Sequence, residues 1–191
     1  MPSIEITLPD GGKQSVEAGS RPIDIAKAVS PRLADAAIVA KVNGELYDLT
    51  RPIETDATVQ ILTSRDPQAL EVYRHSTAHL LAAAVLELFP ETRLGIGPPI
   101  ENGFYYDFDR PTAFSPEDLE RIEKKMWDIR NRDLPYERIL TGKEDGLKKY
   151  SDAWMKCELI TERAGETFSE YTLGPHFIDF CRSAAGSSSR K

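Results

Sequence analysis

The sequence has few cysteines and no long apolar stretch. Two cysteines among 191 residues, Cys157 and Cys181, are too few for a disulfide framework. The residues that follow Met1 include no apolar run of the kind that directs secretion, and the longest apolar run, residues 80–86, is too short to span a membrane. We therefore expect a protein of the reducing cytoplasm with no membrane partner.

An excess of positive charge is also absent. Lysine and arginine total 24 against 31 aspartates and glutamates, a net charge of −7 that argues against non-specific binding of nucleic acid. The most basic stretch, residues 121–138, alternates with acidic residues, so a solvated helix face is a better prediction than an RNA-binding face. Hydrophobic residues make up 40% and charged residues 29%, which is ordinary for a globular protein, and the length favours two small domains.

Residues 1–63 are predicted to form a β-rich unit. Apolar and polar residues alternate over residues 4–8, as in a half-buried strand, and a turn sequence at residues 10–12 predicts a hairpin. Pro22 suits the first position of a short helix. The remaining predicted strands are residues 37–42, 46–49 and 59–62.

A second unit is predicted at residues 68–182, after a linker at residues 64–67. Apolar residues recur at helical spacing over residues 68–89 and predict one long helix, which Pro90 ends. A hairpin and a helix capped by Ser115 follow. The further predictions are a helix at residues 143–155, extended segments at residues 157–160, 167–171 and 176–181, and a disordered tail or cloning scar at residues 183–191.

Two groups of side chains are candidates for chemistry. His75 and His79 lie four residues apart on the predicted long helix, so their imidazoles face the same side and are able to share a ligand, a metal ion or a water. Such a pair alone is more often a packing feature than a site. On the last predicted strand, alternation places Asp179 and Cys181 on one face and His176 on the other.

The first unit resembles a known domain. The segments "ITLPDGGKQSVEAGSRPIDIAKAVSP" and "VAKVNGELYDLTRPI" resemble the TGS domain, a ubiquitin-like β-grasp fold. TGS domains also occur in certain GTPases and in stringent-response enzymes, so this resemblance alone does not select a function. A GTPase would need a GxxxxGK(S/T) phosphate-binding loop, which the sequence lacks.

The second unit resembles a more specific family. The segments "RHSTAHLLAAAVLELFP", "GIGPPIENGFYYDFD", "LPYERI" and "YTLGPHFIDFCR" closely resemble, in the same order, the second amino-terminal domain of threonyl-tRNA synthetases. The likeness covers residues 74–182, and that domain is related to the editing region of alanyl-tRNA synthetases. It implies an overall α+β chain in which an editing domain, with its HxxxH helix packed on an antiparallel sheet, follows the TGS domain.

The resemblance also implies the site residues. The family's editing motif is HxxxH on the helix and CxxxH on a strand, and Ala185 stands where the last histidine is expected. An acidic residue two positions before the cysteine and the lysine in "MKCELI" also match the family's active site. The implied catalytic set is His75, His79, Lys156, Asp179 and Cys181.

A metal is the alternative use of the same residues. His75, His79 and Cys181 predict a three-ligand zinc site of the kind found in the alanyl relatives. We rank it second, because the threonyl family usually edits without a metal and Ala185 is no ligand. No other cofactor is expected, since ATP and a further zinc ion belong to the class II catalytic core, for which this chain has no counterpart.

Three interpretations of function follow from the resemblance. The chain is the proofreading region of a threonine–tRNA ligase, hydrolysing Ser-tRNA(Thr) within the whole enzyme and inactive alone as a truncated piece. Alternatively, it is a freestanding deacylase that acts in trans. The third interpretation is a non-catalytic, TGS-containing module with a tRNA-binding or regulatory role. The expected partners are the seryl-bearing acceptor end of tRNA(Thr) and the remainder of the synthetase, and the chain itself is expected to be a monomer.

Overall fold

A computed structural model describes residues 2–181, 186, 188 and 189. The chain divides into two compact units between Tyr73 and Arg74, which is later than the predicted linker at residues 64–67. None of the helices within these described residues is both long enough and apolar enough to cross a membrane.

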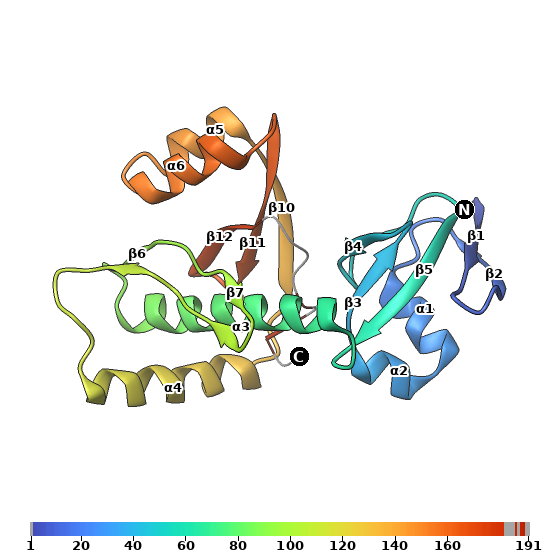
Figure 1. Ribbon diagram of the computed structural model, residues 1–191, viewed down its shortest axis with the longest axis horizontal. Helices are drawn as coiled ribbons and strands as arrows, with labels where there is room; N and C mark the ends of the chain where they lie inside the picture. The colour runs from blue at the N-terminus through green and yellow to red at the C-terminus, as the bar shows by residue number, and fades with distance from the viewer. Residues whose placement is uncertain (1, 182–185, 187, 190–191) are drawn as a thin grey trace. The chain divides into compact units, whose positions relative to one another are not determined.

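The first unit is a five-stranded sheet with helices. Its elements are β1 (Ser3–Thr7), β2 (Lys13–Glu17), α1 (Pro22–Val29), α2 (Pro31–Ala36), β3 (Ala37–Val42), β4 (Glu45–Tyr47) and β5 (Ala57–Thr63). The strand order is β2-β1-β5-β3-β4, in which β1 and β5 are parallel and the other neighbours antiparallel (Figure 1). A two-stranded hairpin, a helix and further strands therefore follow one another as predicted, and they form a β-grasp arrangement.

The core of this unit follows from the alternation of apolar residues. Ile4 and Ile6 of β1 point to the same face as Val59 of β5, and Ile25 of α1 packs against them. Helix α2 was not predicted, although its start carries a recognisable signal. The Ser30 hydroxyl accepts a hydrogen bond from the Leu33 N–H at 3.0 Å, and a proline follows at the first helical position.

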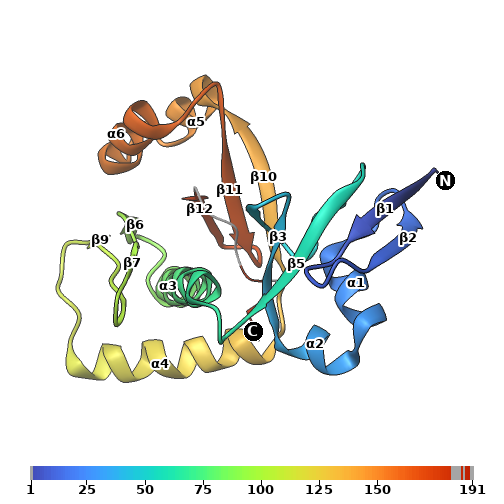
Figure 2. The same cartoon turned by 45° about the vertical axis from the view of Figure 1, so that its right-hand side comes forward.

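The second unit combines a long helix with an antiparallel sheet. Its elements are α3 (Pro67–Leu88), which begins in the first unit, β6 (Arg93–Leu94), β7 (Pro99–Ile100), β8 (Gly103–Phe104), β9 (Phe108–Asp109), α4 (Pro116–Asn131), β10 (Tyr136–Gly142), α5 (Lys143–Lys149), α6 (Trp154–Arg163), β11 (Thr167–Leu173) and β12 (Phe177–Cys181). Strands β10, β11 and β12 form one sheet in that order. Figures 1 and 2 show α3 between this sheet and α4, with α5 and α6 at the far end of the sheet.

The predicted starts of the two long helices are confirmed to within a residue. Helix α3 begins at Pro67, and its apolar Ala69 and Val72 pack with β3 and β5 of the first unit. Helix α4 begins after Ser115, whose hydroxyl accepts a hydrogen bond from the Asp118 N–H at 3.1 Å, while the Asp118 carboxylate accepts one from the Ser115 N–H at 3.2 Å. This reciprocal pair is a capping box.

Two predictions for residues 143–160 were wrong. The single helix predicted at residues 143–155 is two helices, α5 and α6, separated by residues 150–153, and the predicted extended segment at residues 157–160 lies inside α6. On α6 the buried residues Lys156 and Ile160 are four apart on one face. Because one of these buried residues is a lysine, the spacing of apolar residues alone did not indicate a helix here.

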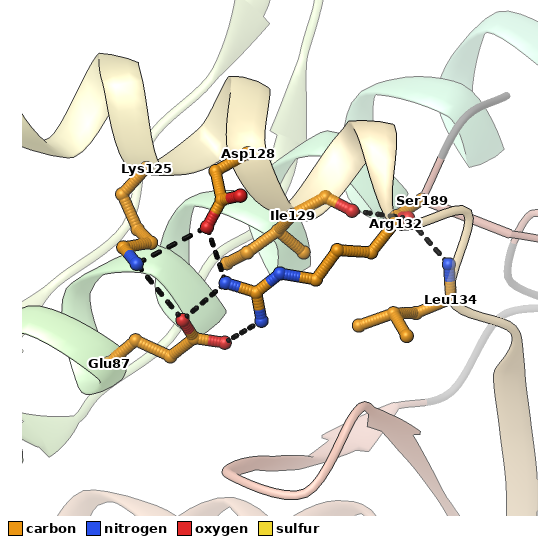
Figure 3. A network of polar contacts seen from close by, with 7 residues as sticks. All are labelled: Glu87, Lys125, Asp128, Ile129, Arg132, Leu134 and Ser189. Carbon is orange, nitrogen blue, oxygen red and sulfur yellow. Dashed lines mark hydrogen bonds and ion pairs between the residues drawn. The ribbon is translucent and has the colours of Figure 1, made fainter.

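Part of the predicted disordered tail packs against the second unit. The Ser189 hydroxyl accepts a hydrogen bond from the Leu134 N–H at 2.9 Å and donates one to the Ile129 carbonyl at 3.0 Å (Figure 3). The Ser188 hydroxyl donates to the Asp133 carboxylate at 2.6 Å. The predicted disorder is therefore wrong at these two serines, because the Ile129 carbonyl, the Leu134 N–H and the Asp133 carboxylate, at and just after the end of α4, bind them.

A charged network joins α3 to α4. Arg132 donates two hydrogen bonds to the Glu87 carboxylate, at 2.8 and 2.9 Å, and Lys125 lies 3.3 Å from the same carboxylate (Figure 3). The hydrogen bonds from Arg132 outweigh the effect of burial and hold the pKa of Glu87 below its ordinary value.

Glu87→Gln is expected to lower the free energy of unfolding by about 1 kcal/mol at neutral pH, because a forked, partly buried ion pair is lost. Since the folded pKa lies below the ordinary value of 4.5, this contribution is present above pH 4.5 and is lost as the pH falls through the folded value. Urea denaturation at pH 7 and at pH 3 measures it, with the exposed Glu123→Gln on α4 as the matched control. An equal difference at both pH values would contradict the assignment.

Candidate functional site

A thiol and two imidazoles meet inside the second unit. The rings of His75 and His79 on α3 lie with their centroids 4.3 Å apart, as expected for residues one turn apart on a helix. Cys181, at the end of β12, brings its Sγ to 2.9 Å from Nε2 of His75. One ligand atom from each of the three residues lies within 4.8 Å of the others. Residues 106 positions apart in sequence therefore form one cluster.

The backbone next to His75 sets its tautomer. The Gly97 carbonyl lies 3.3 Å from Nδ1 of His75. A carbonyl oxygen only accepts hydrogen bonds, so Nδ1 carries the proton when the imidazole is neutral. Nε2 then presents its lone pair to Cys181 and is able to accept the thiol proton.

His79 is fully buried, with 0% of its surface exposed. Its ring packs against Phe177 of β12 and Tyr136 of β10, at centroid distances of 5.1 and 6.2 Å. Within the described part of the chain, neither ring nitrogen has a hydrogen-bond partner. Burial, helped by the charges of His75 and Lys156, lowers the pKa of His79 well below its ordinary value. His79 is therefore a neutral imidazole with two nitrogens available to a ligand.

A second buried group lies around Asp179. Lys156 and Asp179 are each 3% exposed, and the Lys156 ammonium donates a hydrogen bond to Oδ1 of the carboxylate. The Tyr106 hydroxyl donates to Oδ2 of the same carboxylate. Burial first, and the Asp179 charge second, raise the pKa of Tyr106 well above its ordinary value, so its hydroxyl stays a donor. Two donors thus hold one carboxylate away from water.

Strand β12 carries both groups. Phe177, Asp179 and Cys181 alternate along it and point to the face that bears the histidines, whereas Phe180 points to the opposite face and packs with Ile160 of α6. His176 lies before the strand in an exposed turn. The alternation of the sequence predicted that Asp179 and Cys181 share one face of the strand. The approach of the Cys181 thiol to His75 agrees with this prediction.

The structure differs from the sequence analysis at two site positions. Lys156, which the predictions left between a helix at residues 143–155 and an extended segment at residues 157–160, lies inside helix α6. Tyr106 is absent from the predicted site residues, yet its hydroxyl binds Asp179. The alternation of Phe104, Tyr106 and Phe108 toward the interior was the signal that could have found it. Ala185, at the expected histidine position, lies outside the described residues.

Gly97 supports both groups, because its carbonyl contacts His75 and its Cα lies against the ring of Tyr106. Gly97→Ala is expected to lower the free energy of unfolding by about 1–3 kcal/mol, since the new Cβ would overlap that ring. Urea denaturation measures it against Gly165→Ala, whose Cβ would meet nothing closer than 3.9 Å. Equal stability of the two variants would contradict this expectation and show that the loop around Gly97 shifts to accommodate the new Cβ at little cost.

Residues 4–63 match the TGS domain. Threonine–tRNA ligases of Maricaulis maris, Pelobacter propionicus and Staphylococcus saprophyticus are 48%, 46% and 44% identical to the chain over 185, 184 and 183 residues. These matches cover 91%, 95% and 95% of the chain but only 29%, 29% and 28% of the relatives.

The chain thus spans less than one third of the length of these curated relatives. The similarity is nevertheless continuous across both compact units, because it covers more than nine tenths of the chain. The chain is homologous to the amino-terminal region of threonine–tRNA ligases, and its first unit is a TGS domain.

Proposed function

We propose that this chain proofreads for a threonine–tRNA ligase, by hydrolysing the ester of serine wrongly attached to tRNA(Thr). One observation carries the proposal: His79 is neutral, fully buried and free of hydrogen-bond partners among the described residues, and it lies beside a thiol and a second imidazole. A buried polar group without a partner is costly, so such an arrangement indicates a ligand. The homology to threonine–tRNA ligases supplies the class of ligand.

The chemistry explains why such a site is needed. Serine and threonine differ by one methyl group, which gives a binding pocket only about 1–3 kcal/mol of discrimination. A second site that admits serine and excludes the additional methyl removes the mischarged product. Phe177 and Tyr136 pack against the His79 ring, and such close packing is suited to excluding a further methyl group.

In the proposed mechanism, His79 takes a proton from a water molecule bound at a ring nitrogen that has no partner among the described residues. The water oxygen bonds to the ester carbonyl carbon, the bond from that carbon to the ribose oxygen breaks, and the ribose oxygen takes up the proton that His79 carries. Lys156 keeps two N–H groups besides the one bound to Asp179, and supplies positive charge and a donor for the developing oxyanion. Asp179 holds Lys156 and Tyr106 in place by accepting a hydrogen bond from each.

The proposal is tested by incubating the purified chain with Ser-tRNA(Thr) and with Thr-tRNA(Thr). Selective release of serine, abolished when His79 is replaced, supports a deacylase. Release of neither amino acid, with measurable binding of tRNA(Thr), would favour a non-catalytic module. If the chain is inactive but hydrolyses serine once it is joined to the remainder of a threonine–tRNA ligase, the activity belongs to the whole enzyme, with the rest of the synthetase as partner.

Zinc is the second candidate at the same cluster. The two imidazoles and the thiol offer three ligand atoms within 4.8 Å of one another, and the nitrogens of His79, which lack partners in the described part of the chain, fit a ligand role. A zinc ion held by His75, His79 and Cys181 would activate a bound water. Metal analysis of protein purified without chelators decides between the two: one zinc per chain, lost in Cys181→Ser, supports the metal site, whereas metal-free protein supports direct catalysis by His79.

A further inference from the structure

Glu170 is a buried carboxylate that the proposed chemistry does not use. It lies on the central strand β11, on the face that packs against α5 and α6, and is 1% exposed. Three donors surround it: Lys149, whose ammonium lies at 2.8 Å, and the hydroxyls of Tyr150 and Thr141. Burial alone would raise the pKa of Glu170, but these hydrogen bonds outweigh burial and lower it. Glu170 therefore stays a charged anchor beneath the two helices.

Tyr150 joins this anchor to the helix that carries Lys156. Its hydroxyl binds Glu170, and its backbone carbonyl accepts hydrogen bonds from the Ala153 N–H at 2.8 Å and from the Cys157 thiol at 3.0 Å. The Ala153 carbonyl in turn accepts from the Lys156 N–H at 2.9 Å. One tyrosine therefore fixes the turn between α5 and α6 and the first turn of α6.

The same first turn sends the Lys156 ammonium to Asp179 across a buried contact. The lysine side chain is 3% exposed, so its reach is limited by where α6 begins. We propose that Glu170, acting through Tyr150, is a positioning residue that sets Lys156 on Asp179. The role of Lys156 in hydrolysis rests on the proposed function, whereas the positioning itself does not.

The test compares two hydroxyls bound to the same carboxylate. Tyr150→Phe removes the hydroxyl that leads to α6, and Thr141→Val removes one that comes from β10. Each purified chain is labelled with an amine-reactive acetylating reagent, and the modification rate of Lys156 is measured by mass spectrometry. We expect Tyr150→Phe to raise the Lys156 rate about tenfold, since a charge-assisted hydrogen bond is lost, and Thr141→Val to raise it by about twofold or less.

Lys143 serves as the internal reference. Its ammonium binds the carbonyls of Thr161 and Ala164 at the other end of α6. A general loosening of the helices would raise the Lys143 and Lys156 rates together, whereas positioning through Tyr150 raises the Lys156 rate alone. Equal Lys156 rates in Tyr150→Phe and Thr141→Val, or parallel rises at both lysines, would overturn the proposal.

Glu170→Gln gives a second route, with the exposed Glu162→Gln on α6 as its control. Circular dichroism first verifies that each variant is folded, and only folded variants are labelled. In a hydrolysing chain, we expect Tyr150→Phe and Glu170→Gln to lower kcat for Ser-tRNA(Thr) with KM nearly unchanged, and Glu162→Gln to change neither. If the unmodified chain and its fusion to the ligase hydrolyse nothing, the proposed function fails, while the labelling result still decides the positioning.

Discussion

His79→Leu is expected to lower the hydrolysis of Ser-tRNA(Thr) by roughly 10²–10⁴-fold, the usual contribution of a general base. The same change is expected to leave the free energy of unfolding at neutral pH unchanged or to raise it by about 1–2 kcal/mol. Leucine fills a similar volume between Phe177 and Tyr136 and removes two buried nitrogens that lack partners among the described residues. Loss of activity and gain of stability would therefore come from one substitution.

Deacylation kinetics and urea denaturation of the same preparations check both halves of this expectation. His176→Leu, in an exposed turn, is the matched control and is expected to alter neither hydrolysis nor the rank order of stability. Undiminished hydrolysis by His79→Leu would remove this histidine from the mechanism. A loss of several kcal/mol of stability would mean instead that the imidazole is already satisfied by a bound group, and zinc analysis would then identify it.

Lys156→Met is expected to lower the free energy of unfolding by about 3–5 kcal/mol, because it leaves the Asp179 carboxylate buried without its cation. Methionine keeps the unbranched apolar stem, so packing on α6 changes little. Of the two donors on Asp179 only the Tyr106 hydroxyl remains, and a neutral donor does not replace the charge. Urea denaturation at pH 7 measures this loss.

A double variant tests whether the loss comes from the unpaired charge. Lys156→Met combined with Asp179→Asn is expected to be more stable than Lys156→Met alone, because no charge is then buried. Lys148→Met, at an exposed position on α5, is the control and is expected to change stability by less than about 0.5 kcal/mol. Additive losses in the double variant would refute a direct pair between Lys156 and Asp179.

Periodic patterns gave most of the architecture. The alternation at Ile4 and Ile6 predicted a strand, and the proline and cap signals at Pro67 and Ser115 predicted the starts of two long helices that the structure contains. The same periodicities placed His75 beside His79 on one helix face and Asp179 beside Cys181 on one strand face. Each of these features depends on neighbours within one element, which a sequence records directly.

The features that were missed depend on contacts between distant elements. Lys156 occupies a buried helical position because Asp179 on β12 neutralises it. A charge at that position led to the prediction of a helix ending at residue 155 and an extended segment at residues 157–160. The break between α5 and α6 lies where Tyr150 turns to Glu170, 20 residues later in the chain. Tyr106 likewise gains its partner from a strand 73 residues away. No local propensity encodes such pairings.

Strand β12 is an outer strand of its sheet, since among the described strands only β11 pairs with it. An outer strand separates from its neighbour at a smaller free-energy cost than a central one. When β12 separates from β11, Asp179 and Cys181 move away together. One local opening therefore disrupts both the histidine–cysteine cluster and the group around Asp179. Heating is thus expected to abolish the proposed hydrolysis several degrees below the temperature at which the helices unfold. An activity assay would therefore detect this opening before circular dichroism does.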